Sequence, residues 1–118
     1  MQASTKICLL LLLLNLSHLK SHGQEKTDQS GFTSYQFLEL DGYKMRYQTG
    51  GSGDATVVFE CGHGDDLHAW DKIFGDVASF AKVFRYDREG YGFSETATQP
   101  ASFKEIATRL HTLLQKAG

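Results

Sequence analysis

The residues best suited to chemistry lie in the turn Cys61–Gly64, which precedes a polar pair, Asp65 and Asp66. Val57–Phe59, just before it, has the β-branched and aromatic residues of a buried strand, and the glycines end that strand. A Gly-rich turn that enters a helix leaves backbone N–H groups without partners inside the helix. Such groups can bind an anion or a developing oxyanion. The turn therefore predicts an oxyanion site built from main chain.

Side chains of the same turn offer two other chemistries. With Asp66, the residues Cys61, His63, Asp65 and His68 resemble a damaged form of the H-x-H-x-D-H pattern of metallo-β-lactamase-like hydrolases. A metallo-hydrolase that uses His63, Asp65 and His68 is one alternative, but a mixed cluster without a full ligand set is typical of a polar helix start, so we expect no metal. Cys61 beside His63 is a candidate thiol nucleophile, although a Cys at a strand end is more often a small hydrophobic residue.

A second Gly-rich segment, Asp87–Ser94, follows the apolar run at 82–86. We expect Asp87 and Arg88 to hold this loop in shape as an ion pair. Ser94 is expected to form a turn through its hydroxyl and not to act as a nucleophile. Tyr91 is a candidate for the entrance of a pocket, with plain packing as the alternative.

Upstream of both turns, the sequence predicts an antiparallel hairpin. Asp41–Gly42 is a strong two-residue turn signal between apolar segments at 35–40 and 43–48. In the second segment, aromatic and Met residues alternate with Lys44, Arg46 and Gln48. This alternation predicts a strand with one face exposed to solvent.

Two helices are predicted by apolar residues at helical spacing. The first has Asp66 as its N-cap and buries a stripe, and the second spans 103–117 behind the capping box Ser102–Glu105. The stripe of the first helix consists of Trp70, Ile73, Phe74, Val77 and Phe80. Strands at 56–60 and 82–86 precede these helices, so the order predicts an α/β fold whose sheet has a mostly parallel body.

Two segments together resemble the α/β-hydrolase family. Glu60–Gly64 resembles the oxyanion turn after the third strand of these proteins, usually H-G-x-x-G or E-S-G-x-G, and Asp87–Ser94 resembles their D-x-x-G-x-G-x-S loop after the fourth strand. One helix and one strand separate the two, as in the family. The resemblance covers 35–118. It implies the N-terminal part of an α/β-hydrolase fold, an antiparallel hairpin followed by β-α-β-α, with an incomplete sheet.

The resemblance also implies roles for residues. It implies hydrolysis of an ester, amide or related bond by a Ser nucleophile with His and an acid. His63 would donate its backbone N–H to the oxyanion, and Gly62 and Gly64 would be structural residues of that turn. The structural residues of the second loop would be Asp87, Arg88, Gly90, Gly92 and Ser94.

The family's nucleophile elbow, G-x-S-x-G, has no counterpart in this sequence. It would follow the next strand, and Gly51–Gly53 lies on another loop without the pattern. We therefore expect the chain to be the N-terminal portion of a longer serine hydrolase and to be inactive by itself.

Composition narrows the classes of partner. A chain of 118 residues with a net charge of −2 forms one domain at most, and no basic cluster predicts nucleic-acid binding. The expected ligand is a small-molecule substrate, without a cofactor. An exported binding module that uses the fold without catalysis is a further alternative. The open sheet edge at 56–60 favours non-specific self-association.

Residues 1–23 have the layout of a signal peptide, with Lys6, an apolar stretch at 7–14 and a polar stretch that ends at Gly23. Residues 24–34 are predicted to be a linker and 35–118 the domain. We predict export, either secreted or periplasmic, with no stable membrane anchor after cleavage. N-terminal sequencing of the exported protein should find a terminus at or near Gln24, and intact Met1 in the soluble cytoplasm would contradict this prediction.

Overall fold

The computed structural model describes residues 31–118. The predicted signal peptide, 1–23, and residues 24–30 of the predicted linker lie outside the described residues. Just before the first strand, Thr33 is buried, and its backbone N–H donates to the carbonyl of Thr49 at 2.9 Å.

The predicted hairpin is confirmed. Strand β1 (Gln36–Leu40) pairs antiparallel with β2 (Tyr43–Gly50) around the two-residue turn, with Leu40 opposite Tyr43. The predicted exposed face of β2 is confirmed at Lys44 and wrong at Arg46 and Gln48, which are both buried. They face a layer of structure that covers this side of the sheet and supplies polar partners.

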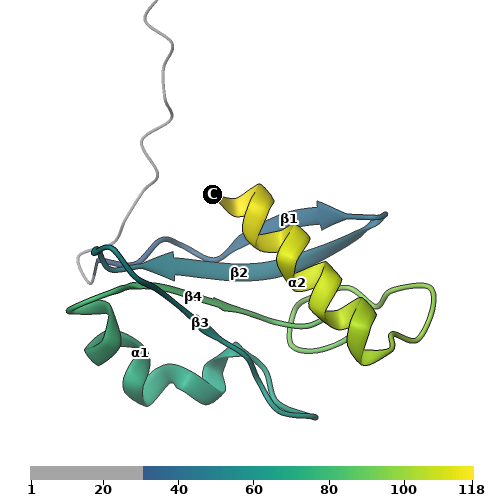
Figure 1. The fold of residues 1–118 in the computed structure, drawn as a ribbon. Coiled ribbons are helices and arrows are strands. Elements are labelled where there is room, and N and C mark those ends of the chain that lie inside the picture. The colour runs from purple at the N-terminus through teal and green to yellow at the C-terminus, as the bar shows by residue number, and fades with distance from the viewer. Residues whose placement is uncertain (1–30) are drawn as a thin grey trace, which may run out of the picture.

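Four strands form one mixed sheet in the order β1-β2-β4-β3 (Figure 1). Strand β4 (Lys82–Tyr86) runs antiparallel to β2 and parallel to β3 (Thr56–Phe59). The sequence predicted a mostly parallel sheet, but only one of the three strand pairings within 31–118 is parallel. Strand β3 lies at an edge of this sheet and leaves it open there; self-association through that edge stays a prediction.

The first predicted helix begins later than expected. Asp66 caps a 3₁₀ turn, η1 (Leu67–Trp70), by accepting from the backbone N–H of His68 at 2.9 Å. The α-helix itself, α1 (Asp71–Ala78), starts after this turn. Of the predicted stripe Phe74 is buried, whereas Ile73 is 43% exposed and Phe80 71% exposed.

The second predicted helix is confirmed as α2 (Phe103–Ala117), with both hydrogen bonds of the capping box at Ser102 and Glu105. Its one buried side chain, Leu113, packs on the sheet. No helix within 31–118 has the length and apolar character needed to cross a membrane.

The two helices cover opposite faces of the sheet. Successive side chains of a strand point to opposite sides, and neighbouring residues of β4 pack against different helices. Phe84 and Tyr86 of β4 pack in the cluster that contains Leu113 of α2. Val83 packs in a second cluster, with Phe59 and with Phe74 of α1. Figure 1 shows α2 across β1 and β2, with α1 on the other side near β3.

Candidate active site

The predicted oxyanion turn follows β3, at the carboxyl end of the parallel strands. This end is where open α/β sheets bind their ligands. Gly64 has a φ of 89°, which favours glycine, whereas Gly62 does not have a positive φ. Within residues 31–118 the backbone N–H of His63 donates no hydrogen bond to protein. The donor proposed for an oxyanion is thus available.

Two side chains of the second Gly-rich loop hold this turn. Arg88 donates from Nη2 to the carbonyl oxygen of Gly62 at 2.7 Å, and its Nε lies 3.4 Å from Oε1 of Glu60. The hydroxyl of Tyr91 forms a hydrogen bond with Nδ1 of His63 at 2.8 Å. The loop after β4 therefore holds Gly62 through its carbonyl and His63 through its imidazole.

Asp87 is a fully buried carboxylate that accepts three hydrogen bonds from three segments. They come from Nε of Arg46 at 2.7 Å, the backbone N–H of Leu67 at 2.8 Å and that of Phe93 at 3.0 Å. The predicted Asp87–Arg88 ion pair is wrong, because Arg46 on β2 is the partner of Asp87. A charge removed from water needs such partners, so Asp87 fixes where β2, η1 and the second Gly-rich loop meet.

The remaining residues of the second loop fit around this carboxylate. At Gly92, φ is 52° and a Cβ would lie 2.3 Å from Oδ2 of Asp87, so a larger residue would collide with the carboxylate. Ser94 donates from Oγ to the carbonyl of Asp87 at 2.7 Å and accepts from the backbone N–H of Arg46 at 2.8 Å. These bonds match the turn-forming role predicted for Ser94.

The strand ends also carry two buried titratable groups. Tyr86 donates its hydroxyl to Oε2 of Glu60, and burial raises the pKa of that phenol above its ordinary value. Cys61 is buried and donates from Sγ to the carbonyl of Asp66 at 2.9 Å, and burial raises the pKa of the thiol. A raised pKa disfavours the thiolate, the reactive form, so the structure favours a packing role for Cys61.

The structure does not bring the residues of the metal alternative together. His63 faces Tyr91, and Nδ1 of His68 lies 3.1 Å from Oδ2 of Asp71. Across residues 31–118, no three His, Cys, Asp or Glu side chains are grouped so that they could hold a metal ion.

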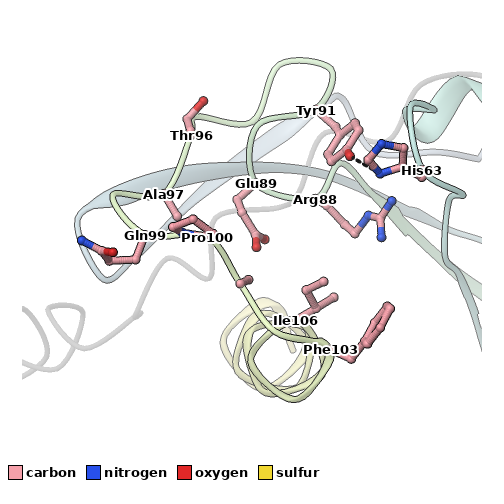
Figure 2. A pocket seen from close by; sticks show the side chains of 11 residues that line it. His63, Arg88, Glu89, Tyr91, Thr96, Ala97, Gln99, Pro100, Phe103 and Ile106 are labelled. Atoms are coloured by element: carbon pink, nitrogen blue, oxygen red, sulfur yellow. Dashed lines mark hydrogen bonds between the residues drawn. The ribbon is translucent and has the colours of Figure 1, made fainter.

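A cavity of about 760 Å³ opens beside the predicted oxyanion turn (Figure 2). His63 and Tyr91 lie at one side, and the first turns of α2 lie across from them. Tyr91 therefore lines a pocket, which agrees with its predicted place at a pocket entrance more than with the alternative of plain packing. The lining residues are His63, Arg88, Glu89, Tyr91, Thr96, Ala97, Gln99, Pro100, Ala101, Phe103 and Ile106.

Sequence reasoning missed several of these contributors. Phe103 and Ile106 have the ordinary helical spacing of apolar residues in α2, yet they line the cavity, and Phe103 is 92% exposed. The only local sequence signal at Arg46 was its place as a polar residue in an alternating strand. The signal for its role was the charge opposite to that of Asp87, which becomes useful once the strand order places β2 beside β4.

Comparison with known proteins gives sequence relatives and solved structures. No protein-family model matches the chain. The dihydrolipoyllysine-residue acetyltransferase component of the acetoin cleaving system of Cupriavidus necator is 28% identical over 91 residues, 77% of this chain and 24% of that protein. The uncharacterized protein YqjL of Bacillus subtilis is 30% identical over 80 residues, 66% of this chain and 31% of that protein. The chain thus spans less than a third of either relative.

Solved structures define the fold. The Cif epoxide hydrolase from Acinetobacter nosocomialis superposes with a TM-score of 0.66 at 28% identity, covering 73% of this chain and 27% of that one. The enol-lactonase from Burkholderia xenovorans has a TM-score of 0.63 at 24% identity, covering 68% and 32%. The fold is that of the N-terminal part of an α/β hydrolase. Here the turn after β3 and the loop after β4 meet beside the cavity.

Proposed function

We propose that this chain supplies the oxyanion turn and one side of the substrate pocket of an exported α/β-fold hydrolase. The bond cleaved would be an ester, an amide or a related bond. The observation that carries the proposal is the unengaged backbone N–H of His63 beside a cavity, at the carboxyl ends of β3 and β4. The enol-lactonase among the similar structures supports the ester class, since an enol-lactone is a cyclic ester.

The chemistry asked of this turn is charge stabilisation. When a nucleophile attacks a carbonyl carbon, the carbonyl oxygen gains negative charge, and a fixed N–H about 2.7–3.1 Å away stabilises it. Among residues 31–118 the candidate Ser94 does not serve as the nucleophile, because its hydroxyl is buried and already engaged. The nucleophile, base and acid are assigned to the whole enzyme and to no residue of this chain.

A pair of substitutions at His63 tests the proposal. They are introduced into the longest polypeptide that carries this sequence, which is first identified in its source with an antibody against α2. His63→Pro removes the backbone N–H, and we expect kcat for p-nitrophenyl esters to fall by about 10²–10³-fold, the usual effect of losing one oxyanion donor. His63→Ala keeps the N–H and should retain most of the activity.

Tyr91→Phe is the matched control, because it removes the hydrogen bond to the imidazole of His63 and leaves the N–H in place. Thermal unfolding of each variant identifies losses caused by misfolding. Full activity in a folded His63→Pro protein would contradict the proposal. Equal losses in the Pro and Ala variants would assign the role to the imidazole instead.

A further inference from the structure

We propose that Arg88 is a positioning residue that orients and polarises the peptide between Gly62 and His63. The inference rests on the proposed function of the oxyanion turn and adds to it the group that keeps the donor aimed. Its starting observation is that two groups belong to one peptide unit. The carbonyl that Arg88 holds and the N–H proposed as the oxyanion donor belong to the same amide plane.

The first consequence is geometric. A trans peptide is planar, and its C=O and N–H point in opposite directions. Nη2 of Arg88 lies 2.7 Å from the oxygen of Gly62, so it fixes the direction of the His63 N–H on the other side of the plane. The other donor to this oxygen is the backbone N–H of Asp65 at 3.4 Å, which is longer and uncharged. Arg88 is therefore the main restraint on the plane.

The second consequence is electronic. Hydrogen bonds from a guanidinium are charge-assisted and are about twice as strong as neutral ones. A charge-assisted bond to the carbonyl draws electron density away from the amide nitrogen, and hydrogen bonds in series strengthen one another. The N–H of His63 becomes a better donor to a negatively charged oxygen as a result.

The guanidinium is itself held in place. Its side chain is 16% exposed, its Nε is 3.4 Å from Oε1 of Glu60, and its carbon lies 5.0 Å from the centre of the Tyr91 ring. A cation over an aromatic face is attracted by the ring. Figure 2 shows Arg88, Tyr91 and His63 together at one side of the cavity. A charge fixed on three sides can hold a peptide plane without reorganising during a reaction.

The chain offers a matched control in Arg109. This arginine pairs with Glu89 and has a side chain that is 17% exposed, close to the 16% of Arg88. It does not contact the oxyanion turn. Arg109→Met therefore removes a similar charge from the same region without touching the carbonyl of Gly62.

The direct test is an NMR measurement that needs no activity. Gly62–His63 is the single Gly-His pair in the sequence, so labelling glycine carbonyls with ¹³C and histidine nitrogens with ¹⁵N gives one cross-peak for this peptide. In Arg88→Met we expect an upfield shift of the Gly62 carbonyl and of the His63 amide proton. Shifts no larger than those in Arg109→Met would overturn the inference.

The functional test uses the whole enzyme. We expect Arg88→Met to lower kcat about tenfold, the equivalent of one charge-assisted hydrogen bond, with little change in KM and partial rescue by Arg88→Lys. In a His63→Pro background Arg88→Met should have no further effect on kcat, and a further tenfold loss there would refute action through this N–H. If His63→Pro alone leaves turnover unchanged, the proposed function fails, while the NMR shifts still decide the role of Arg88.

Discussion

Replacing Asp87 with alanine is expected to lower the free energy of unfolding by about 3–5 kcal/mol, the cost of removing one partner of a buried ion pair. Arg46, also buried, would keep its charge without a carboxylate. The backbone N–H groups of Leu67 and Phe93 would lose their acceptor at the same time. Urea unfolding followed by circular dichroism gives the change in free energy.

Two further variants separate charge from hydrogen bonding. Asp87→Asn keeps the shape and one acceptor oxygen, so it should lose less stability than Asp87→Ala. The double variant Arg46→Met, Asp87→Ala should be more stable than the sum of the single changes predicts, since neither charge is then left buried alone. Strict additivity would show that Arg46 and Asp87 do not depend on each other.

The parts of the fold that could be predicted from sequence are those set by neighbours along the chain. The turn at Asp41–Gly42 and the capping box at Ser102 and Glu105 were both found, because each depends on a few consecutive residues. The late start of α1 was missed. Asp66 is a sound cap, but it caps one 3₁₀ turn, and the chain becomes α-helical only at Asp71.

The buried polar layer between the sheet and η1 could not be predicted, because it depends on long-range pairing. Alternation placed Arg46 and Gln48 on a solvent face, as it would for most antiparallel strands. In the structure Arg85 on the neighbouring strand donates from Nε to Gln48 at 2.9 Å and from Nη1 to Asp71 at 2.5 Å. Only the strand order brings these groups together.

The candidate site also has parts that could be predicted from local sequence and parts that depend on long-range contacts. The Gly-rich turn at Cys61–Gly64 could be located because glycines after an apolar run are a local signal, and its role as an oxyanion site stays a prediction. The partner of Arg88 was not found, because the carbonyl of Gly62 lies 26 residues away along the chain. A cavity wall such as Phe103 has no local signal at all, since its spacing is that of an ordinary helix.

The second large effect is expected at Leu113, the one fully buried side chain of α2. It packs against a cluster that includes Leu40, Met45 and Tyr86. Leu113→Ala should cost about 2–5 kcal/mol, since the lost methyl groups leave a cavity that the sheet cannot fill. Leu110→Ala is the control on the same helix, and a smaller loss is expected because Leu110 is only partly buried.

The consequence of this substitution reaches the site, because α2 carries Phe103 and Ile106 to the cavity. Leu113 is the buried member of the apolar contacts between α2 and the sheet, whereas Lys116 bonds the carbonyl of Glu39 from an exposed position. Losing the Leu113 contacts should therefore open α2 locally before the strands separate. Amide exchange in Leu113→Ala should accelerate along 103–117 while the β1–β2 pairing stays protected. Uniform acceleration across the sheet and helix would mean that α2 and the strands unfold as one unit, and that the cavity wall is as stable as the core.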